Sequence, residues 1–559
     1  MPQMVTRMTS QAQVEPIEPS PIVAQDHRGE TRRALIRNIS FDVIARIGYL
    51  VSRVFIPPFV LAHVGLSAYS LWSAVFLIVA YVGVSSIGFT SAYVKLVAEY
   101  VGHGETRKAN SVLSTGLVIC GLVSGSFLVL LALGMPQVLR WFHVPANLVS
   151  DARYVILLVV GMHSCEIVLS VFKSALAGSQ KILEVQRIWV VQYLLEAALV
   201  FFFVGAGYGI RGLADAFALS TGMSIVLNAM LARRIAPWLH ISMRSVSRES
   251  WQRLFHFGGV LQCSAVLIQT LESAERLIAA PLIGLDAVGV LDIASKLPRV
   301  STSIPSAFAG AFMPASAYLH AGLPESERRN ALQKLYLKGS RYMIFVASAM
   351  LGFMATAAGP ILLAWMGKVY SGTIYLMAIF AIQQHFDCLT GPGTSILRGM
   401  GRPWQEFSYT IPNFLLAALF IPLSRLVTGG WSATGLGTAI AASQIVAAIG
   451  FIARANRLFE LSWRQYARAV LLPSAVPYLV GWIFALPALR LAASTNRWHV
   501  ALAVLGVGAI YVIVLCVVME RFVLTNEERH WFRETVNERW LRYKSLFRAL
   551  LKLIPLQSA

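Results

Sequence analysis

Long apolar stretches dominate this chain, and short polar segments separate them. Each stretch is long enough to cross a hydrocarbon core, which takes ~20 residues of helix. The chain has 14 such runs, with predicted bounds of 40–64, 69–94, 111–134, 153–177, 186–206, 211–233, 255–283, 287–312, 341–366, 373–397, 408–427, 433–455, 467–492 and 499–519. The pattern predicts about 14 transmembrane helices.

The composition supports the same fold class. Of the 559 residues, 57% are hydrophobic and 13% are charged, whereas soluble proteins have about 25% charged residues. We therefore expect an all-α polytopic membrane protein.

The net charge of +20 is placed unevenly. Lys and Arg gather in alternate loops, such as 233–253, 324–341 and 454–468, while 63–70 and 284–289 are almost uncharged. Basic loops stay on the cytoplasmic side, so the asymmetry is a topology signal and nucleic-acid binding is not expected. An even number of spans then places both termini in the cytoplasm.

The chain also repeats itself. GLSAYSLW at 65–72 matches GLDAVGVL at 284–291 with an offset of 219, and SALAGSQK at 174–181 pairs with SILRGMGR at 395–402 with an offset of 221. Because six spans return the chain to the same side, the two copies run with the same polarity and are related by a pseudo-two-fold axis along the membrane normal.

These patterns divide the chain into two pseudo-two-fold-related six-helix lobes plus two extra C-terminal helices. The predicted parts are a disordered cytoplasmic tail at 1–38 with no cleaved signal, an N-lobe at 39–233, a cytoplasmic linker at 234–253, a C-lobe at 254–458, spans 13 and 14 at 459–522, and an amphipathic cytoplasmic C-terminal helix at 523–559.

The region 65–117 has a recognisable set of features. A turn opens it at Gly65 to Ser70, with Ser70 where Gly is commoner; Gly83 and Gly88 form a bend; and the Ala-Glu-Tyr sequence at 98–100 closes the span before a short acidic-basic loop. In these features the chain resembles bacterial polysaccharide exporters of the multidrug/oligosaccharidyl-lipid/polysaccharide (MOP) flippase superfamily.

The resemblance implies a transporter of the bacterial cytoplasmic (inner) membrane. Such a protein flips a lipid-linked oligosaccharide, usually on polyprenyl pyrophosphate, by ion-coupled alternating access during exopolysaccharide, capsule or O-antigen synthesis. No cofactor is implied beyond a coupling proton or Na⁺. Membrane lipids, a polysaccharide polymerase and glycosyltransferases are the expected partners.

Charged residues inside the first span raise a question of depth. Asp42, Arg46, Tyr49 and Arg53 follow one another at spacings of 4, 3 and 4, so they share one face of a helix. Asp42 and Arg46 lie within reach of the headgroups, but Arg53 is ~20 Å deep at 1.5 Å per residue. A lipid-facing arginine there costs at least ~3 kcal/mol. Arg53 must therefore face a cavity or a partner.

Similar polar stripes occur in the fourth, seventh, eighth and tenth spans. Several such stripes can be buried together only by facing one interior, which predicts a cationic cavity for a pyrophosphate and sugars. The candidate substrate-binding residues are Arg46, Arg53, Arg276, Lys296 and Arg299. The alternative is that i to i+4 pairs, Glu272 with Arg276 and Asp292 with Lys296, neutralise each other.

Four buried carboxylates are candidates for coupling to an ion, because such groups exchange protons readily: Glu166, Glu272, Glu275 and Asp387. Permanent pairing with a nearby Arg or Lys is the alternative for each. The five cysteines lie inside predicted spans without metal-ligand spacing.

Other functions fit less well. A membrane glycosyltransferase, polymerase or ligase would show a large extramembrane loop, and an enzyme is not expected. A drug/cation antiporter should have a more acidic cavity. A peptidoglycan lipid-precursor flippase stays open, because its cargo is also a polyprenyl pyrophosphate.

Overall fold

The computed structural model describes residues 21–179, 181–491, 496–524 and 529, and all regular structure in these ranges is helical. The first half of the chain forms α1 (Pro21–Gly102), α2 (Thr106–Leu133), α3 (Met135–Trp141), α4 (Val149–Val168), α5 (Ser170–Gly178), α6 (Ile182–Gly205) and α7 (Gly209–Ile235). The second half forms α8 (Arg248–Leu282), α9 (Leu285–Ser301), α10 (Ser303–Gly322), α11 (Glu325–Thr356), α12 (Ala358–Met366), α13 (Thr373–Gly399), α14 (Phe407–Thr428), α15 (Ala433–Leu458), α16 (Trp463–Tyr466), α17 (Leu472–Leu491) and α18 (Arg497–Val518).

Each of the 14 predicted runs lies largely in these helices. The thirteenth begins with a π-helix at Ala467–Leu471, and the fourth, eighth and ninth are each divided between two helices. By length and composition, nine helices of the described residues could cross a membrane, or ten if one bent pair counts as a single span. Helices satisfy their own backbone hydrogen bonds, which is why apolar runs of this length fold in this way in lipid.

The first two predicted spans form one 82-residue helix, α1, with a break at Gly65. Gly65 has φ 79° and ψ 175°, a conformation that only glycine adopts easily. Gly284, between α8 and α9, has φ 127° and ψ 173°. The two glycines are 219 residues apart, the offset at which the sequence repeats.

Other predicted runs are interrupted. The eighth breaks at Thr302, which lies between Pro298 and Pro305. The ninth was expected to be continuous, but α11 and α12 meet at 82°. Pro360 is the third residue of α12 and has no N–H to donate to the last turn of α11, which explains the break.

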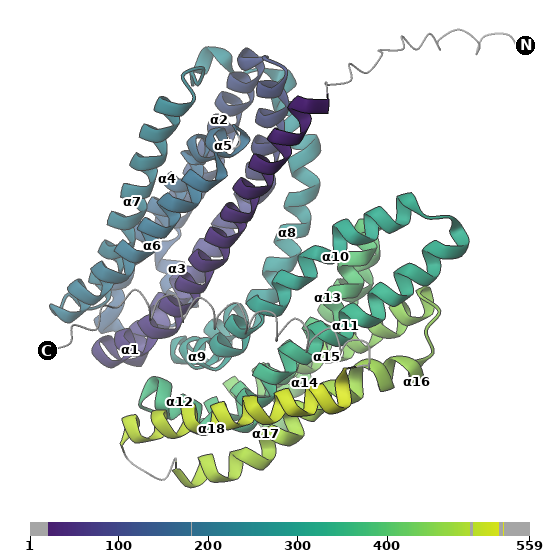
Figure 1. The fold of residues 1–559 in the computed structure, drawn as a ribbon. Coiled ribbons are helices and arrows are strands. Elements are labelled where there is room, and N and C mark those ends of the chain that lie inside the picture. The colour runs from purple at the N-terminus through teal and green to yellow at the C-terminus, as the bar shows by residue number, and fades with distance from the viewer. Residues whose placement is uncertain (1–20, 180, 492–495, 525–528, 530–559) are drawn as a thin grey trace, which may run out of the picture.

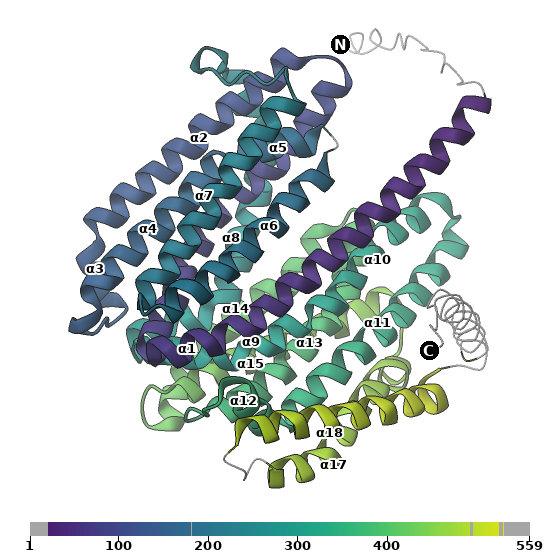
Figure 2. The same ribbon diagram turned by 60° about the vertical axis from the view of Figure 1, so that its left-hand side comes forward.

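The helices form two groups set at an angle to each other (Figures 1 and 2). In the first group, α1, α2, α4, α5, α6 and α7 pack together; in the second, α10, α11, α13, α14 and α15 do so, with α17 on α11 and α18 on α12. Helix α8 packs along α1 and α2, while α9 contacts both α1 and α13 and so connects the groups.

One buried apolar cluster extends through both groups, since it includes Val75 of α1, Val159 of α4, Val288 of α9 and Phe380 of α13. Small residues allow the helices to approach closely: a Cβ on Gly437 of α15 would lie 3.2 Å from the Phe380 ring. Close packing of this kind holds helices together in lipid, where the hydrophobic effect between helices is weak.

The structure differs from the prediction at the N-terminal end of the chain, and it describes little of the C-terminal end. Residues 21–38 were expected to belong to a disordered tail, but they form the first turns of α1. Pro21 stands at the first helical position, where its fixed φ favours a helix start. Residues 1–20 and most of the expected C-terminal helix at 523–559 lie outside the described residues.

Candidate functional site

A cluster of polar side chains joins the two halves where α1, α8 and α9 meet. The Tyr69 hydroxyl of α1 donates to Oδ2 of Asp292 in α9 at 2.7 Å. Lys296, one turn further along α9, donates to the same carboxylate oxygen at 2.7 Å and to the Tyr69 hydroxyl at 2.9 Å. Arg276 of α8 lies 3.5 Å from Oδ1 of Asp292. Two cations thus share one buried carboxylate, so among the described side chains of the cluster the positive charges outnumber the negative ones by one.

A polar cavity of about 480 Å³ lies beside this cluster, in the second half of the chain. Its wall carries amides, hydroxyls and charged groups from α8, α9, α10, α13, α14 and α15. The lining residues are Glu275, Arg299, Thr302, Ser306, Ala309, Met343, Gln383, Gln384, Asp387, Cys388, Thr390, Gly391, Thr394, Arg398, Glu406, Tyr409, Thr410, Asn413 and Gln444.

The two arginines of the polar cavity are ion-paired. Arg299 pairs with Glu275, which is almost fully buried. Arg398 forms a bidentate pair with Glu406, with N–O distances of 2.6 to 3.0 Å. With Asp387, the lining holds three carboxylates and two guanidinium groups, so the cavity is of mixed charge and not cationic as a whole.

Asp387 differs from the other acidic residues of the polar cavity in its hydrogen-bond partners. Its Oδ1 accepts from the Tyr409 hydroxyl at 3.0 Å and from Nε2 of Gln444 at 2.9 Å. Gln383 in turn donates to Gln444. Among the described residues, neutral donors hold this carboxylate, so a proton or a monovalent cation would not have to displace an ion-pair partner of that part of the chain.

Arg53 lies in the first group of helices. Its two terminal nitrogens each lie 3.2 Å from an oxygen of Glu196 in α6, and its guanidinium lies 4.8 Å from the centre of the Tyr49 ring. The depth argument required a cavity or a partner, and the structure supplies a partner. On the same side of the molecule, Glu166 lies 3.3 Å from His163 within α4.

The predicted site residues are therefore only partly brought together. Arg276, Lys296, Arg299 and Glu275 gather around α9, whereas Arg53 and Glu166 lie with other partners in the first half. The side chains of Arg46 and Glu272 lie outside the described residues. The i to i+4 pair of Asp292 with Lys296 is present, and every predicted cation whose side chain is described has an acidic partner.

Sequence reasoning missed four residues of these clusters: Glu196, Tyr69, Tyr409 and Gln444. A signal existed for Glu196, which is the one acidic residue within the run 186–206. The depth argument made for Arg53 applies equally to this carboxylate. Tyr69 and Gln444 gave no such signal, since hydroxyl and amide groups are common in membrane helices.

Comparison with known proteins identifies the fold. No family model matches the chain, and no curated protein matches it. Among solved structures, the lipid II flippase MurJ in an inward closed conformation has a TM-score of 0.66 at 12% identity, covering 87% of this chain and 99% of its own. An inward-facing multidrug resistance MATE family transporter of the MOP superfamily has a TM-score of 0.61 at 16% identity, covering 75% and 94%.

A third solved structure, a MOP superfamily transporter from Pyrococcus furiosus described as having a binding pocket of reversed polarity, has a TM-score of 0.54 at 15% identity and covers 76% of this chain and 94% of its own. At sequence identities of 12% to 16%, the similarity to these solved structures shows a shared fold and nothing further. The chain is an all-helical polytopic membrane protein with the fold of MOP-superfamily transporters.

Proposed function

We propose that this chain flips a lipid-linked oligosaccharide, carried on polyprenyl pyrophosphate, across the bacterial cytoplasmic membrane by ion-coupled alternating access. The fold is that of MOP-superfamily transporters, and region 65–117 resembles polysaccharide exporters. Both termini would then be cytoplasmic.

The lining of the polar cavity is the observation that carries the proposal. Four amide side chains, Gln383, Gln384, Asn413 and Gln444, face it together with six hydroxyl groups from Ser, Thr and Tyr residues. Amides and hydroxyls both donate and accept hydrogen bonds, which suits the hydroxyl groups of sugars. A lipophilic cation would be better served by aromatic rings, and among the described side chains that line the cavity Tyr409 is the one aromatic residue.

The shared carboxylate of Asp292 supports an anionic group on the cargo. Among the described side chains, Arg276 and Lys296 have one acidic partner between them, so a phosphate could bind there without breaking both ion pairs. Arg299 follows Lys296 by three residues on α9 and lines the polar cavity. A pyrophosphate at the cluster would therefore place its sugars toward the cavity.

Asp387 is the leading group for ion coupling. Glu275 and Glu166 are held by Arg299 and His163, whereas Asp387 is held by Tyr409 and Gln444. Binding of a proton or Na⁺ at Asp387 would alter this hydrogen-bond arrangement on the cavity wall and thereby link the ion to the cargo.

A peptidoglycan lipid-precursor flippase is the second candidate. It is favoured by the similarity to the lipid II flippase MurJ, which extends over 87% of this chain, compared with 75% for the MATE family transporter. Its cargo has the same pyrophosphate and polyprenyl chemistry, so the two functions differ in the sugar.

Deleting the gene and analysing lipid-linked intermediates on each membrane face tests the proposal. We expect a complete polyprenyl-linked repeat unit to accumulate on the cytoplasmic face. The wild-type gene should clear it and Arg299→Ala should not. Arg187→Ala is a matched control, since Arg187 is exposed and pairs with Glu184 at the start of α6. Accumulation of the peptidoglycan precursor would favour the second candidate, and sensitivity to cationic drugs without any such intermediate would contradict both.

A further inference from the structure

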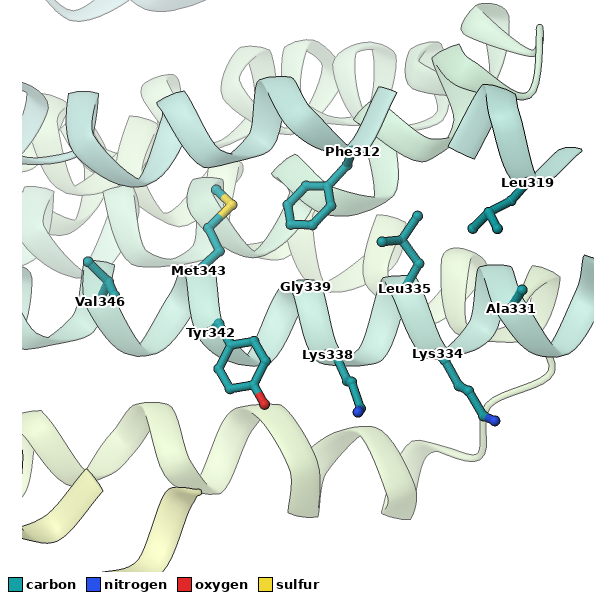
Figure 3. Close-up of a pocket in the computed structure, with 10 residues that line it drawn as sticks. All are labelled: Phe312, Leu319, Ala331, Lys334, Leu335, Lys338, Gly339, Tyr342, Met343 and Val346. Atoms are coloured by element: carbon teal, nitrogen blue, oxygen red, sulfur yellow. The ribbon is translucent and has the colours of Figure 1, made fainter. Parts of the chain in front are cut away.

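A second cavity, the α10–α11 groove, opens between these two helices and has a different chemistry (Figure 3). Its volume is about 600 Å³, within the range of sites that hold small organic ligands. Figure 3 shows Phe312 of α10 and Met343 of α11 lying between the two helices. The described lining residues are Phe312, Leu319, Ala331, Lys334, Leu335, Lys338, Gly339, Tyr342, Met343 and Val346, and among them the polar groups come from two lysines and one tyrosine.

The two lysines are exposed and lie one turn apart on α11. Lys334, Lys338 and Tyr342 are spaced by four residues and point to the same side of the helix in Figure 3. In the described part of the chain neither lysine forms an ion pair, although Arg328 and Arg329 nearby pair with Glu325 and Glu460. Figure 3 shows that the side of α11 with the two lysines faces away from α10, whereas Leu335 and Met343 point toward it. The two positive charges therefore lie along the edge of the groove, with no acidic partner among the described residues.

The length of the groove matches the depth of one leaflet. Lys334 and Val346 are 12 residues apart on α11, or ~18 Å at 1.5 Å per residue. Half of a bilayer's hydrocarbon core is ~15 Å. The first half of α11, from Glu325 to Arg341, is rich in Lys and Arg, and the positive-inside rule places this end of the helix at the cytoplasmic side. The lysines then lie at the inner headgroup level, and Val346 lies near the middle of the membrane.

We propose that the α10–α11 groove binds an anionic phospholipid of the inner leaflet. The phosphate lies against Lys334 and Lys338, and one acyl chain runs along Leu335 and Met343 to Val346. Anionic lipids are attracted to basic side chains at this leaflet, and the apolar wall excludes water from the chain. This site is independent of the identity of the transported cargo.

Met343 gives the bound lipid a route to the transport pathway. Its side chain lines both the α10–α11 groove and the polar cavity, so the two share one wall. A Cβ on Gly391 of α13 would lie 2.9 Å from the Met343 methyl group, which shows how tightly that side chain is held on the cavity side. An acyl chain in the groove would restrict Met343 from the other side as well.

Native mass spectrometry of the detergent-purified full-length protein tests the site, with phosphatidylglycerol as the probe and phosphatidylethanolamine as the neutral comparison. We expect preferential binding of phosphatidylglycerol and a ~30-fold weaker affinity in Lys334→Gln/Lys338→Gln, since each basic residue contributes about a factor of five at an anionic surface. Arg329→Gln, which removes a paired charge from the same helix, should bind as the wild type does. Val346→Trp, which fills the far end of the groove, should lower the affinity although both lysines remain.

Three results would overturn the proposal. Equal phosphatidylglycerol affinity in the wild type and in a double variant with an unchanged melting temperature would remove the lysines from any site. Binding of a polyprenyl phosphate but not of phosphatidylglycerol would assign the groove to the cargo's carrier. Binding that appears only after deletion of residues 530–559 would show that the chain's own C-terminal segment fills the groove.

Discussion

Ser70 of α1 and Gly289 of α9 touch across the two halves of the chain. A Cβ on Gly289 would overlap the Ser70 side chain, so only glycine allows the two helices to approach this closely here. The two residues are 219 positions apart, the same offset that separates Gly65 from Gly284. In a structure with two copies of one unit, equivalent residues meet only at the axis that relates the copies. The contact therefore lies where a pseudo-two-fold axis would pass.

A disulfide across this contact should stop transport. The Ser70 Cβ lies 3.1 Å from the position that a Cβ of residue 289 would take, near the usual disulfide range of about 3.5–4.5 Å. In a background without the native cysteines, Ser70→Cys/Gly289→Cys should cross-link on oxidation and lose transport by more than ~10-fold, because the halves can no longer separate there. A reductant should restore transport to the level of Gly289→Cys alone, which is the control because any Cβ at position 289 displaces the Ser70 side chain. Normal transport by the cross-linked protein would show that this contact stays closed throughout the cycle.

The Arg53–Glu196 pair allows a structural role to be separated from cargo binding. Removing either partner alone should destabilise the protein by about 2 kcal/mol, less than for a fully buried pair because Arg53 is 31% exposed. The swapped variant Arg53→Glu/Glu196→Arg restores an ion pair between α1 and α6, so the melting temperature should recover. Transport should not recover, because the guanidinium group is then carried by α6 and no longer by α1. Recovery of transport in the swapped variant would argue that Arg53 serves only to pair with Glu196.

Asp292 should matter more to stability than Tyr69. Asp292→Asn leaves Arg276 and Lys296 without their shared carboxylate and should cost about 3–5 kcal/mol. Tyr69→Phe removes one hydroxyl from the same cluster and should cost about 1–2 kcal/mol. Thermal unfolding in detergent gives the comparison. Equal losses in the two variants would mean that the cations find other acceptors.

Asp387→Asn should uncouple transport from its driving ion. The amide keeps the shape and can still hydrogen-bond Tyr409 and Gln444, but it neither gains a proton nor neutralises Na⁺ at this position. In proteoliposomes we expect cargo to equilibrate without accumulating under a Na⁺ or proton gradient. Glu406→Gln is the control, because Glu406 lines the same cavity but is paired with Arg398. Gradient-driven accumulation by Asp387→Asn would move the coupling site elsewhere.

Local features of the sequence were enough to predict much of the fold. The apolar runs fold as helices, because in lipid an apolar run must satisfy its own backbone. The predicted starts are wrong where a helix continues into a polar segment: α1 begins at Pro21 and α11 at Glu325, against predicted starts at 40 and 341. Gly65 and Gly284 occupy the same position in the two copies of the repeat, and both have a positive φ where one helix ends and the next begins. The bend before α12 was not expected, since it depends on how the last turn of α11 and Pro360 accommodate each other.

The sequence by itself determined which charged residues lie too deep to face lipid, since depth follows from position along a helix and from the cost of an unpaired charge in hydrocarbon. Only the tertiary structure decided their partners: Glu196, 143 residues from Arg53, and Asp292, which Arg276 and Lys296 share. Spacing along the chain shows which side chains have one helix face in common. Which faces meet depends on the rotation and crossing of packed helices, and these are set by the whole assembly of side chains.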